Sequence, residues 1–311
     1  MKRIAIIDLG TNTFNLLIVD MDKSNSYQIV FQTKIPVKLG ENGINKNFIS
    51  KIPFQRGIRA LQEYKSTIEF YKATAIYAFA TSGIRSAANG IDFANAAKEV
   101  AGIDIKIISG EEEAELIYYG VRQAVEMDES NSLIIDIGGG STEFIIANKN
   151  KIVWKQSFLL GVARLLEKFN PSDPITPNEI ETIVNYLRAE LIPLIQAIEK
   201  YPVKELIGSS GSFDSLADII AEKFYTLTIL ESKTEYQFNL NDFNLIYELL
   251  LNSTKDDRLN MKGLVEMRVD MIVISTILVQ FVLSQFQIKN MRLSTYSLKE
   301  GVLYQLLNSE I

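Results

Sequence analysis

The chain has 311 residues, 47% of them hydrophobic, and carries a net charge of −6 at pH 7. This length exceeds the roughly 250–300 residues at which a single core stops growing, so two domains are expected. The acidic balance offers no general basic field for nucleic acid, and the absence of cysteine and histidine excludes disulfides, thiol nucleophiles, zinc sites built on those side chains and imidazole bases.

Two similar polar turns stand out, each between two apolar strands. Residues 4–7 and 14–19 predict strands, and the turn over residues 8–13 reads DLGTNT. The arrangement returns 128 positions later, from Asp8 to Asp136: strands are predicted over 132–135 and 143–147, around the turn DIGGGST. Two such hairpins indicate a duplicated αβ domain, with both turns facing a shared cleft.

The segment between the hairpins alternates helix and strand. Helices are predicted over 48–70, 91–100 and 111–125, and strands over 75–80 and 103–108. The third helix has the apolar spacing of an amphipathic helix and follows Ser109 and Gly110, a plausible start. The polar residues 126–131 mark the expected boundary between domains 1–125 and 126–311.

Long helices dominate the second half. They are predicted over 178–200, with a kink at Pro193, and over 216–223, 242–251 and 265–285. A helix near 297–311 is expected to pack back on the first domain. The apolar stretch 271–283 is shorter than the ~20 residues that a membrane span needs, so it predicts a buried helix.

The expected cellular location and binding partners of the protein are also inferred from features that the sequence lacks. The N-terminal apolar run stops at Asp8 without a small-residue cleavage site, which favours a strand over a signal peptide. The lack of cysteine suits a reducing compartment, and the expected location is the cytoplasm. We expect no nucleic-acid or membrane partner, and a homodimer is left open.

The second turn has the composition of a phosphate-binding loop. Gly138, Gly139 and Gly140 permit backbone angles closed to other residues, so their N–H groups can converge on a phosphate, beside the hydroxyls of Ser141 and Thr142. The alternative is a flexible hairpin turn, but two residues suffice for a hairpin. The motif is not a Walker A loop, because Gly-x4-Gly-Lys-Ser/Thr is absent. The first turn is expected to face the same phosphate through Gly10, Thr11, Asn12 and Thr13.

Asp8 and Asp136 both stand at the ends of strands that read as buried. An unpaired carboxylate there would be costly unless it met a cation or hydrogen-bond donors. A hard cation, Mg²⁺ or Mn²⁺, held between these carboxylates and phosphate oxygens fits this requirement. The alternative is that each aspartate caps its own turn.

Seven motifs in order resemble the exopolyphosphatase / guanosine pentaphosphate phosphohydrolase (Ppx/GppA) family across nearly the whole chain. They are residues 8–13, 80–85, 108–114, 136–143, 208–212, 268–270 and 298–302. The resemblance implies an α/β fold with duplicated ribonuclease H-like domains of the actin-like ATPase superfold and a cleft between them. It also implies metal-dependent release of terminal orthophosphate from inorganic polyphosphate, by in-line attack of water.

The resemblance assigns roles to single residues. Glu113 matches the base that orients the water, although a run of three glutamates is by itself usually a solvated helix start, as we expect for Glu111 and Glu112. Glu143 is expected to support the metal or the water. Arg85 could grip phosphate with its planar fork, or form a surface ion pair. The second-domain glycine loop adds three phosphate contacts, at Gly208, Ser209 and Gly211.

Alternatives remain open at this point. The motifs do not separate polyphosphate from guanosine pentaphosphate, whose 5′ γ-phosphate is the second candidate target. A kinase or ATPase of the same superfold, or a silent phosphate sensor, is a more distant alternative. The chain departs from the family pattern at residues 38–43 and at Lys299, and it is expected to be the short form without the helical domain of longer relatives.

Overall fold

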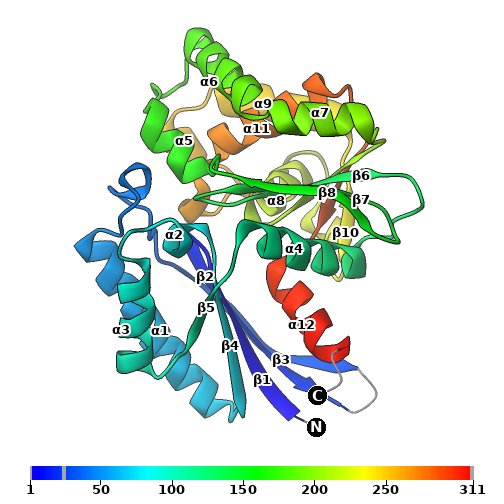
Figure 1. Cartoon of the computed structure of the whole chain (residues 1–311). Helices are drawn as coiled ribbons and strands as arrows, with labels where there is room; N and C mark the ends of the chain where they lie inside the picture. Colours follow the sequence, from blue (N-terminus) through cyan, green and yellow to red (C-terminus); the bar gives the residue numbers. More distant parts are fainter. Residues whose placement is uncertain (1, 23–25, 309–311) are drawn as a thin grey trace.

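The structure is a computed structural model that describes residues 2–22 and 26–308. Its first sheet has the strand order β3-β2-β1-β4-β5 (Figure 1). β1, β2 and β3 are antiparallel neighbours, and β4 and β5 run parallel to β1. The strands are β1 (Lys2–Leu9), β2 (Thr13–Met21), β3 (Tyr27–Pro36), β4 (Ala75–Ala80) and β5 (Ile105–Ile107).

The second sheet repeats this plan. Its order is β10-β11-β9-β6-β7-β8, so three antiparallel strands are again followed by two parallel ones, with β10 added antiparallel at the edge. The strands are β6 (Ser132–Ile137), β7 (Thr142–Ala147), β8 (Ile152–Phe158), β9 (Leu206–Ser209), β10 (Glu235–Gln237) and β11 (Met291–Ser294). The shared order confirms the predicted fold of duplicated ribonuclease H-like domains.

We call each sheet with its outer helices a lobe. The first lobe carries α1 (Lys51–Phe70), α2 (Ser82–Arg85), α3 (Gly90–Ala101) and a 3₁₀ turn, η1 (Ile44–Lys46). The second carries α5 (Val162–Phe169), α6 (Pro177–Glu190), α7 (Ile192–Lys200), α8 (Gly211–Phe224), η2 (Leu227–Ile229), α9 (Leu240–Leu251), α10 (Lys255–Leu259), η3 (Glu266–Arg268) and α11 (Ile272–Gln285).

Two helices lie between the sheets, α4 (Gly110–Ala124) and α12 (Leu298–Asn308) (Figure 1). One buried cluster joins them to both sheets: it includes Ile6 of the first sheet, Ile117 of α4, Ile134 of the second sheet and Val302 of α12. The C-terminal helix therefore packs against α4 and the first sheet. This shared core fixes the positions of the two hairpins, and therefore of their polar turns, relative to each other.

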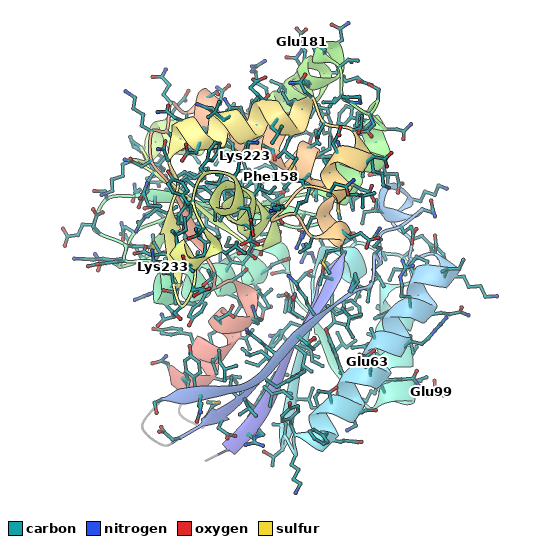
Figure 2. All side chains as sticks on the ribbon, turned by 180° about the vertical axis from the view of Figure 1, so that it is seen from behind. Glu63, Glu99, Phe158, Glu181, Lys223 and Lys233 are labelled. Carbon is teal, nitrogen blue, oxygen red and sulfur yellow. The ribbon has the colours of Figure 1, made fainter. Side chains whose placement is uncertain are left out.

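Charged side chains occupy the outside of both lobes, and apolar ones the interior. Figure 2 shows this for the exposed Glu63, Glu99, Glu181, Lys223 and Lys233 and for the buried Phe158. α11 is buried nearly all round, and the hydroxyls of Ser275 and Thr276 are satisfied by the carbonyl of Ile272. No helix in the described part of the chain is long and apolar enough to cross a membrane.

Most predicted elements are confirmed with shifted ends, and two are corrected. The predicted helix 178–200 is two helices that meet at Leu191, because α7 starts afresh with Pro193 in its first turn. The predicted helix 265–285 begins only at Ile272, and η3 precedes it. Several elements were not predicted, among them the strands β3, β8, β9, β10 and β11 and the helix α5. Polar residues interrupt the apolar pattern of β3 and β8, and β9, β10 and β11 have only three or four residues each.

Candidate functional site

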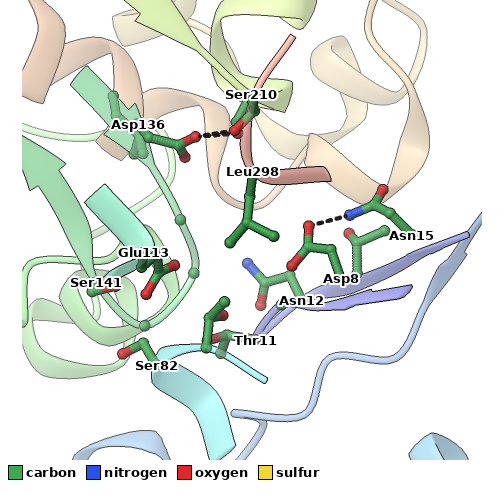
Figure 3. Close-up of a pocket in the computed structure, with 18 of the residues that line it drawn as sticks. Asp8, Thr11, Asn12, Asn15, Ser82, Glu113, Asp136, Ser141, Ser210 and Leu298 are labelled. Carbon is green, nitrogen blue, oxygen red and sulfur yellow. Dashed lines mark hydrogen bonds between the residues drawn. The ribbon is translucent and has the colours of Figure 1, made fainter. Parts of the chain in front are cut away.

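A narrow cavity of about 90 Å³ lies between the two polar turns (Figure 3). Ten residues predicted from the two turns line it: Asp8, Gly10, Thr11, Asn12, Thr13, Asp136, Gly138, Gly139, Gly140 and Ser141. Glu113 of α4 lines the same cavity. The tertiary structure thus brings together carboxylates, hydroxyls and a glycine-rich turn from both lobes and from the helix between them.

The two turns are closed by equivalent backbone hydrogen bonds. The N–H of Gly10 donates to the carbonyl of Thr13 over 3.1 Å, and the N–H of Gly138 donates to the carbonyl of Ser141 over 3.0 Å. β1 and β2 pair so that Asn15 is opposite Asp8, and β6 and β7 place Glu143 opposite Asp136. Asn15 and Glu143 are therefore equivalent positions in the two hairpins.

The glycines of the second turn serve close approach and not an unusual backbone angle. Among the described glycines, only Gly102 and Gly263 have positive φ, so the expectation that Gly138, Gly139 and Gly140 use such angles is wrong. A Cβ on Gly139 would overlap the side-chain amide of Asn12 in the opposite turn. A Cβ on Gly140 would lie 2.6 Å from Oγ1 of Thr11. Side chains here would fill the space between the two turns.

Asp136 is anchored by three serine hydroxyls on a single oxygen. Its Oδ2 accepts hydrogen bonds from Ser209 (2.7 Å), Ser210 (2.7 Å) and Ser297 (2.6 Å). The bond from Ser210 is drawn in Figure 3. Ser297 comes from the segment before α12, so strand β9 and the C-terminal segment together fix this carboxylate.

Asp8 is the matching carboxylate of the first turn. Its Oδ2 accepts a hydrogen bond of 2.9 Å from Nδ2 of Asn15. Burial raises the pKa of Asp8 to about 6, and the negative charge of Asp136 adds to the increase, while Asn15 and Lys299 oppose it. The raised pKa means that ionised Asp8 lacks full compensation, which is a condition that a bound cation would relieve.

The geometry of α4 turns Glu113 toward the interior and its two glutamate neighbours outward. The hydroxyl of Ser109 caps this helix by accepting from the N–H of Glu112 over 3.1 Å. Glu111 is exposed and Glu112 pairs with Lys106 at 2.6 Å, so both face outward as predicted. Glu113 lies on the inner face and is 7% exposed.

The carboxylate of Glu113 is paired with Arg85. Nη1 of Arg85 lies 2.7 Å from Oε2 of Glu113, and it also donates to the carbonyl of Ile108 over 3.1 Å. Burial holds the pKa of Glu113 well above 4.5, and the negative charge of Glu143 raises it further, while Arg85 lowers it. A carboxylate with a raised pKa can accept a proton near neutral pH.

Glu143 supports the second turn from behind. Its Oε1 accepts hydrogen bonds from Ser141 (2.6 Å) and from Ser157 of β8 (2.7 Å). It is 1% exposed and does not line the cavity. Burial, followed by the charge of Asp136, raises its pKa to about 7. Glu143 therefore reaches the cavity indirectly, through the hydroxyl of Ser141.

Several predicted contacts lie away from the cavity wall. The hydroxyl of Thr142 donates to the carbonyl of Leu160 over 3.0 Å, so it is turned away from the proposed phosphate. Gly208 leaves room for the ring of Phe213, and Gly211 leaves room for the guanidinium of Arg268. Ser209 acts on Asp136, and Arg85 on Glu113. These five residues and Glu143 surround the site without lining it: Arg85, Thr142, Glu143, Gly208, Ser209 and Gly211.

Sequence reasoning missed six polar residues of the cavity wall: Asn15, Thr81, Ser82, Ser210, Arg268 and Ser297. Four of them stand inside the motifs that carry the family resemblance, and that position was the available signal. Oγ of Ser82 is buried and has no hydrogen-bond partner within the described residues. A buried hydroxyl without a partner costs free energy, so this atom is suited to meet a ligand or water.

The cavity offers two carboxylates for a cation, Asp8 and Asp136. The described residues contain no cluster of three Asp, Glu, His or Cys side chains that could hold a metal ion by itself. Mg²⁺ commonly binds through one or two carboxylates, waters and substrate phosphates, so the two aspartates fit a metal that is held jointly with a phosphorylated substrate.

Comparison with known proteins gives a consistent picture. The model of the Ppx/GppA phosphatase family matches residues 17–310. The crystal structure of an exopolyphosphatase from Cytophaga hutchinsonii superposes with a TM-score of 0.94 at 40% identity, over 99% of this chain and 98% of that one. A Haemophilus influenzae relative is 28% identical over 306 residues, which cover 98% of this chain and 91% of the relative. The Aquifex aeolicus Ppx/GppA family member shares the fold, with a TM-score of 0.80 at 23% identity over 98% of this chain and 97% of that one.

Proposed function

Because the chain belongs to the Ppx/GppA phosphatase family, we propose that it is an exopolyphosphatase that hydrolyses the terminal phosphoryl group of inorganic polyphosphate with the help of Mg²⁺ or Mn²⁺. The observation that carries this proposal is the position of Glu113. Its buried carboxylate lines the same small cavity as the glycine-rich turn that is suited to a phosphate.

The chain's own residues account for the reaction. The backbone N–H groups of the second turn hold the terminal phosphoryl group, together with hydroxyls such as those of Thr11 and Ser82. Glu113 positions a water molecule and accepts its proton as the water oxygen attacks phosphorus. The bridging P–O bond breaks on the opposite side, and the shortened polyphosphate leaves. Phosphoryl transfer depends mainly on such positioning and on electrostatic stabilisation.

Asp8 and Asp136 would hold the metal, which when bound would neutralise charge on the phosphate oxygens. The raised pKa of Asp8 and the closeness of a second carboxylate support this assignment. The three hydroxyl donors on Oδ2 of Asp136 support it as well, since they fix the orientation of that side chain.

The size of the cavity supports a substrate that enters by its end. Pockets for drug-sized ligands are about 300–1,000 Å³, whereas this one is about 90 Å³. It suits a terminal phosphoryl group and a water, while the remainder of the substrate stays outside. None of the described residues that line the walls is aromatic, so these walls offer no stacking surface to a purine.

The proposal is tested by measuring orthophosphate release from long-chain polyphosphate, guanosine pentaphosphate and ATP in parallel, with Mg²⁺, with Mn²⁺ and after metal removal. We expect the highest kcat/KM with polyphosphate and no turnover in EDTA. A preference for guanosine pentaphosphate would show that this nucleotide is the substrate, and the proposed hydrolysis of a terminal phosphate would still hold. Transfer of phosphate from ATP to another acceptor, or binding without turnover, would refute the hydrolase.

A further inference from the structure

The carbonyl groups of the three glycines in the second turn are bound by α5, on the side away from the cavity. The N–H of Val162 donates to the carbonyl of Gly138 over 2.9 Å. The N–H groups of Ala163 (2.9 Å) and Arg164 (3.3 Å) donate to the carbonyl of Gly139. The side chain of Arg164 completes the series, with Nε donating to the carbonyl of Gly140 over 3.2 Å. The first turn of α5 thus engages three consecutive carbonyls.

This arrangement sets the direction of the N–H groups that follow. In a trans peptide the C=O and N–H bonds point to opposite sides, and these peptides are trans. Carbonyls directed at α5 therefore turn the N–H groups of Gly139, Gly140 and Ser141 away from α5. Over residues 2–22 and 26–308, none of these three N–H groups has a hydrogen-bond partner. They remain available to an anion in the cavity that their residues line.

Arg164 differs from the other two anchors because its side chain also binds the first lobe. Nη1 donates to the carbonyl of Ile44 over 2.8 Å and reaches the side-chain oxygens of Asn45 and Asn47 at 3.5 Å. Nη2 donates to Ser86 over 3.4 Å. The side chain of Asn45 returns a bond of 3.0 Å to the carbonyl of Arg164. One guanidinium therefore joins the phosphate turn of the second lobe to η1 and α2 of the first.

The same first-lobe segment also anchors the first turn. The N–H of Leu39 donates to the carbonyl of Thr11 over 2.6 Å, and those of Val37 and Lys38 donate to the carbonyl of Asn12, each over 2.9 Å. Residues 37–47 thus hold the carbonyls of Thr11 and Asn12 directly and that of Gly140 through the side chain of Arg164. The contacts of this one segment therefore reach both polar turns.

The partners of Arg164 are unusual for a buried charge. The residue is 8% exposed, every acceptor of its guanidinium is neutral, and no ion pair of the described residues includes it. The negative charge of Glu167, on the same helix, acts on this guanidinium, but no direct ion pair between the two is present among the described residues. A buried cation without a carboxylate partner is costly for stability, and it adds positive potential beside the turn where phosphate is expected.

We propose that Arg164 is a positioning residue that keeps the N–H of Ser141 aimed at the terminal phosphoryl group and makes this orientation depend on contact between the lobes. The proposal rests on the proposed function, because it takes the second turn as the phosphate site. When η1 moves away from α5, Arg164 loses its first-lobe acceptors, and the Gly140–Ser141 peptide is held less firmly. Closure of the cleft thereby prepares the phosphate site.

The test compares Arg164→Ala and Arg164→Lys with a matched control, Arg292→Ala. Arg292 is also a bridging arginine of the second lobe, paired with Glu205 at 2.6 Å and Glu235 at 3.0 Å, but it does not line or support the cavity. The measurements are kcat and KM for polyphosphate, the Kd for orthophosphate by calorimetry, the melting temperature, and the effect of millimolar guanidinium ion on each variant.

We expect Arg164→Ala to lower kcat/KM by about 10–100-fold, the effect of losing one charge-assisted hydrogen bond, and to weaken orthophosphate binding. Added guanidinium ion should restore part of the activity. Arg164→Lys should recover little, because one ammonium group cannot bridge Gly140 and Ile44. Arg292→Ala should lower the melting temperature, keep kcat/KM within about twofold, and show no response to guanidinium ion.

Two results would overturn the proposal: normal kcat/KM and orthophosphate affinity in folded Arg164→Ala, or losses that match those of Arg292→Ala. If Arg164→Ala does not fold, Arg164→Gln is compared in the same way. If the wild-type protein releases no phosphate from any substrate, the proposed function fails, while the orthophosphate affinities of the variants still decide the role of Arg164.

Discussion

Arg85 donates a hydrogen bond of 2.7 Å from Nη1 to Oε2 of Glu113, across the junction between α2 and α4. This contact joins the residue expected to clamp phosphate to the residue expected to act as base. The positive charge of Arg85 lowers the pKa of Glu113, against the larger effect of burial. The pair therefore keeps a buried glutamate able to ionise, and a base must be ionised before it can accept a proton.

Replacement of Arg85 should change the pH profile. Loss of the guanidinium leaves burial and Glu143 to act on Glu113, so the acid limb of kcat for Arg85→Ala should lie at higher pH than in the wild type. Arg85→Lys keeps the charge and should shift the limb less, but the loss of the planar fork should raise KM for polyphosphate more than it lowers kcat. The profile is measured from pH 5 to pH 9. Coincident acid limbs in all three proteins would show that Arg85 does not influence the ionisation of Glu113. An unchanged KM in Arg85→Lys would exclude Arg85 as a residue that grips the phosphate of the substrate.

Glu113→Gln should lower kcat by about 10²–10⁴-fold while KM changes little, because glutamine keeps the shape of glutamate and loses its basicity. Glu112→Gln and Glu111→Gln are the matched controls on the same helix turn, since Glu112 faces Lys106 and Glu111 faces solvent. Both should retain most of the activity, as measured by orthophosphate release. Similar small losses in all three variants, or inactivation by Glu112→Gln alone, would show that the base is elsewhere.

Glu113→Gln should also stabilise the metal-free protein against unfolding at high pH. The pKa of Glu113 in the folded state is raised above the ordinary value of 4.5, so the folded state holds the proton more tightly than the unfolded state. Stability is thus lost as pH rises through the folded-state pKa. Glu113→Gln removes this loss and should raise the melting temperature by a few degrees at pH 8, with a smaller gain at pH 5. An equal gain at both pH values would point to a cause other than ionisation.

Gly139→Ala should abolish orthophosphate binding without unfolding the protein. The added Cβ would overlap the amide of Asn12 and force the two turns apart, and Gly139→Val should act more strongly. Calorimetry with orthophosphate and far-ultraviolet circular dichroism separate binding from folding. Gly102→Ala is the control, because Gly102 has φ of +64° at the end of α3, far from the cavity, and should lose stability without losing affinity. An unchanged affinity of Gly139→Ala for orthophosphate would show that the second turn is not the phosphate site.

Metal binding should depend on phosphate. With two carboxylates as protein ligands, Mg²⁺ alone should raise the melting temperature only slightly, and Mg²⁺ with orthophosphate should raise it more than the two separate effects combined. Asp136→Asn should remove this synergy, and EDTA should abolish turnover of the wild type. Full turnover after rigorous metal removal would eliminate the metal from the mechanism. Strong binding of Mg²⁺ without phosphate would show that the protein supplies further ligands.

Local patterns in the sequence determined a large part of the fold and the core of the site. Each hairpin is a short apolar strand, a polar turn and a second apolar strand, so both turns could be located before any tertiary contact was known. The spacing of apolar residues located α4, and its three glutamates limited the choice of base. Such features are readable because alternation and helical spacing involve residues that are neighbours in the chain.

Only the tertiary structure decided which of these groups work together. Ser297 reaches Asp136 from 161 positions away, and Arg164 meets Ile44 across 120 positions. The family resemblance had already assigned the base to Glu113, and burial of one face of α4 places that residue at the cavity. The approach of Asn12 explains the absence of a side chain at Gly139. These relationships arise because α4 and α12 pack between two sheets that are distant in sequence. No local pattern records which surfaces that packing brings into contact.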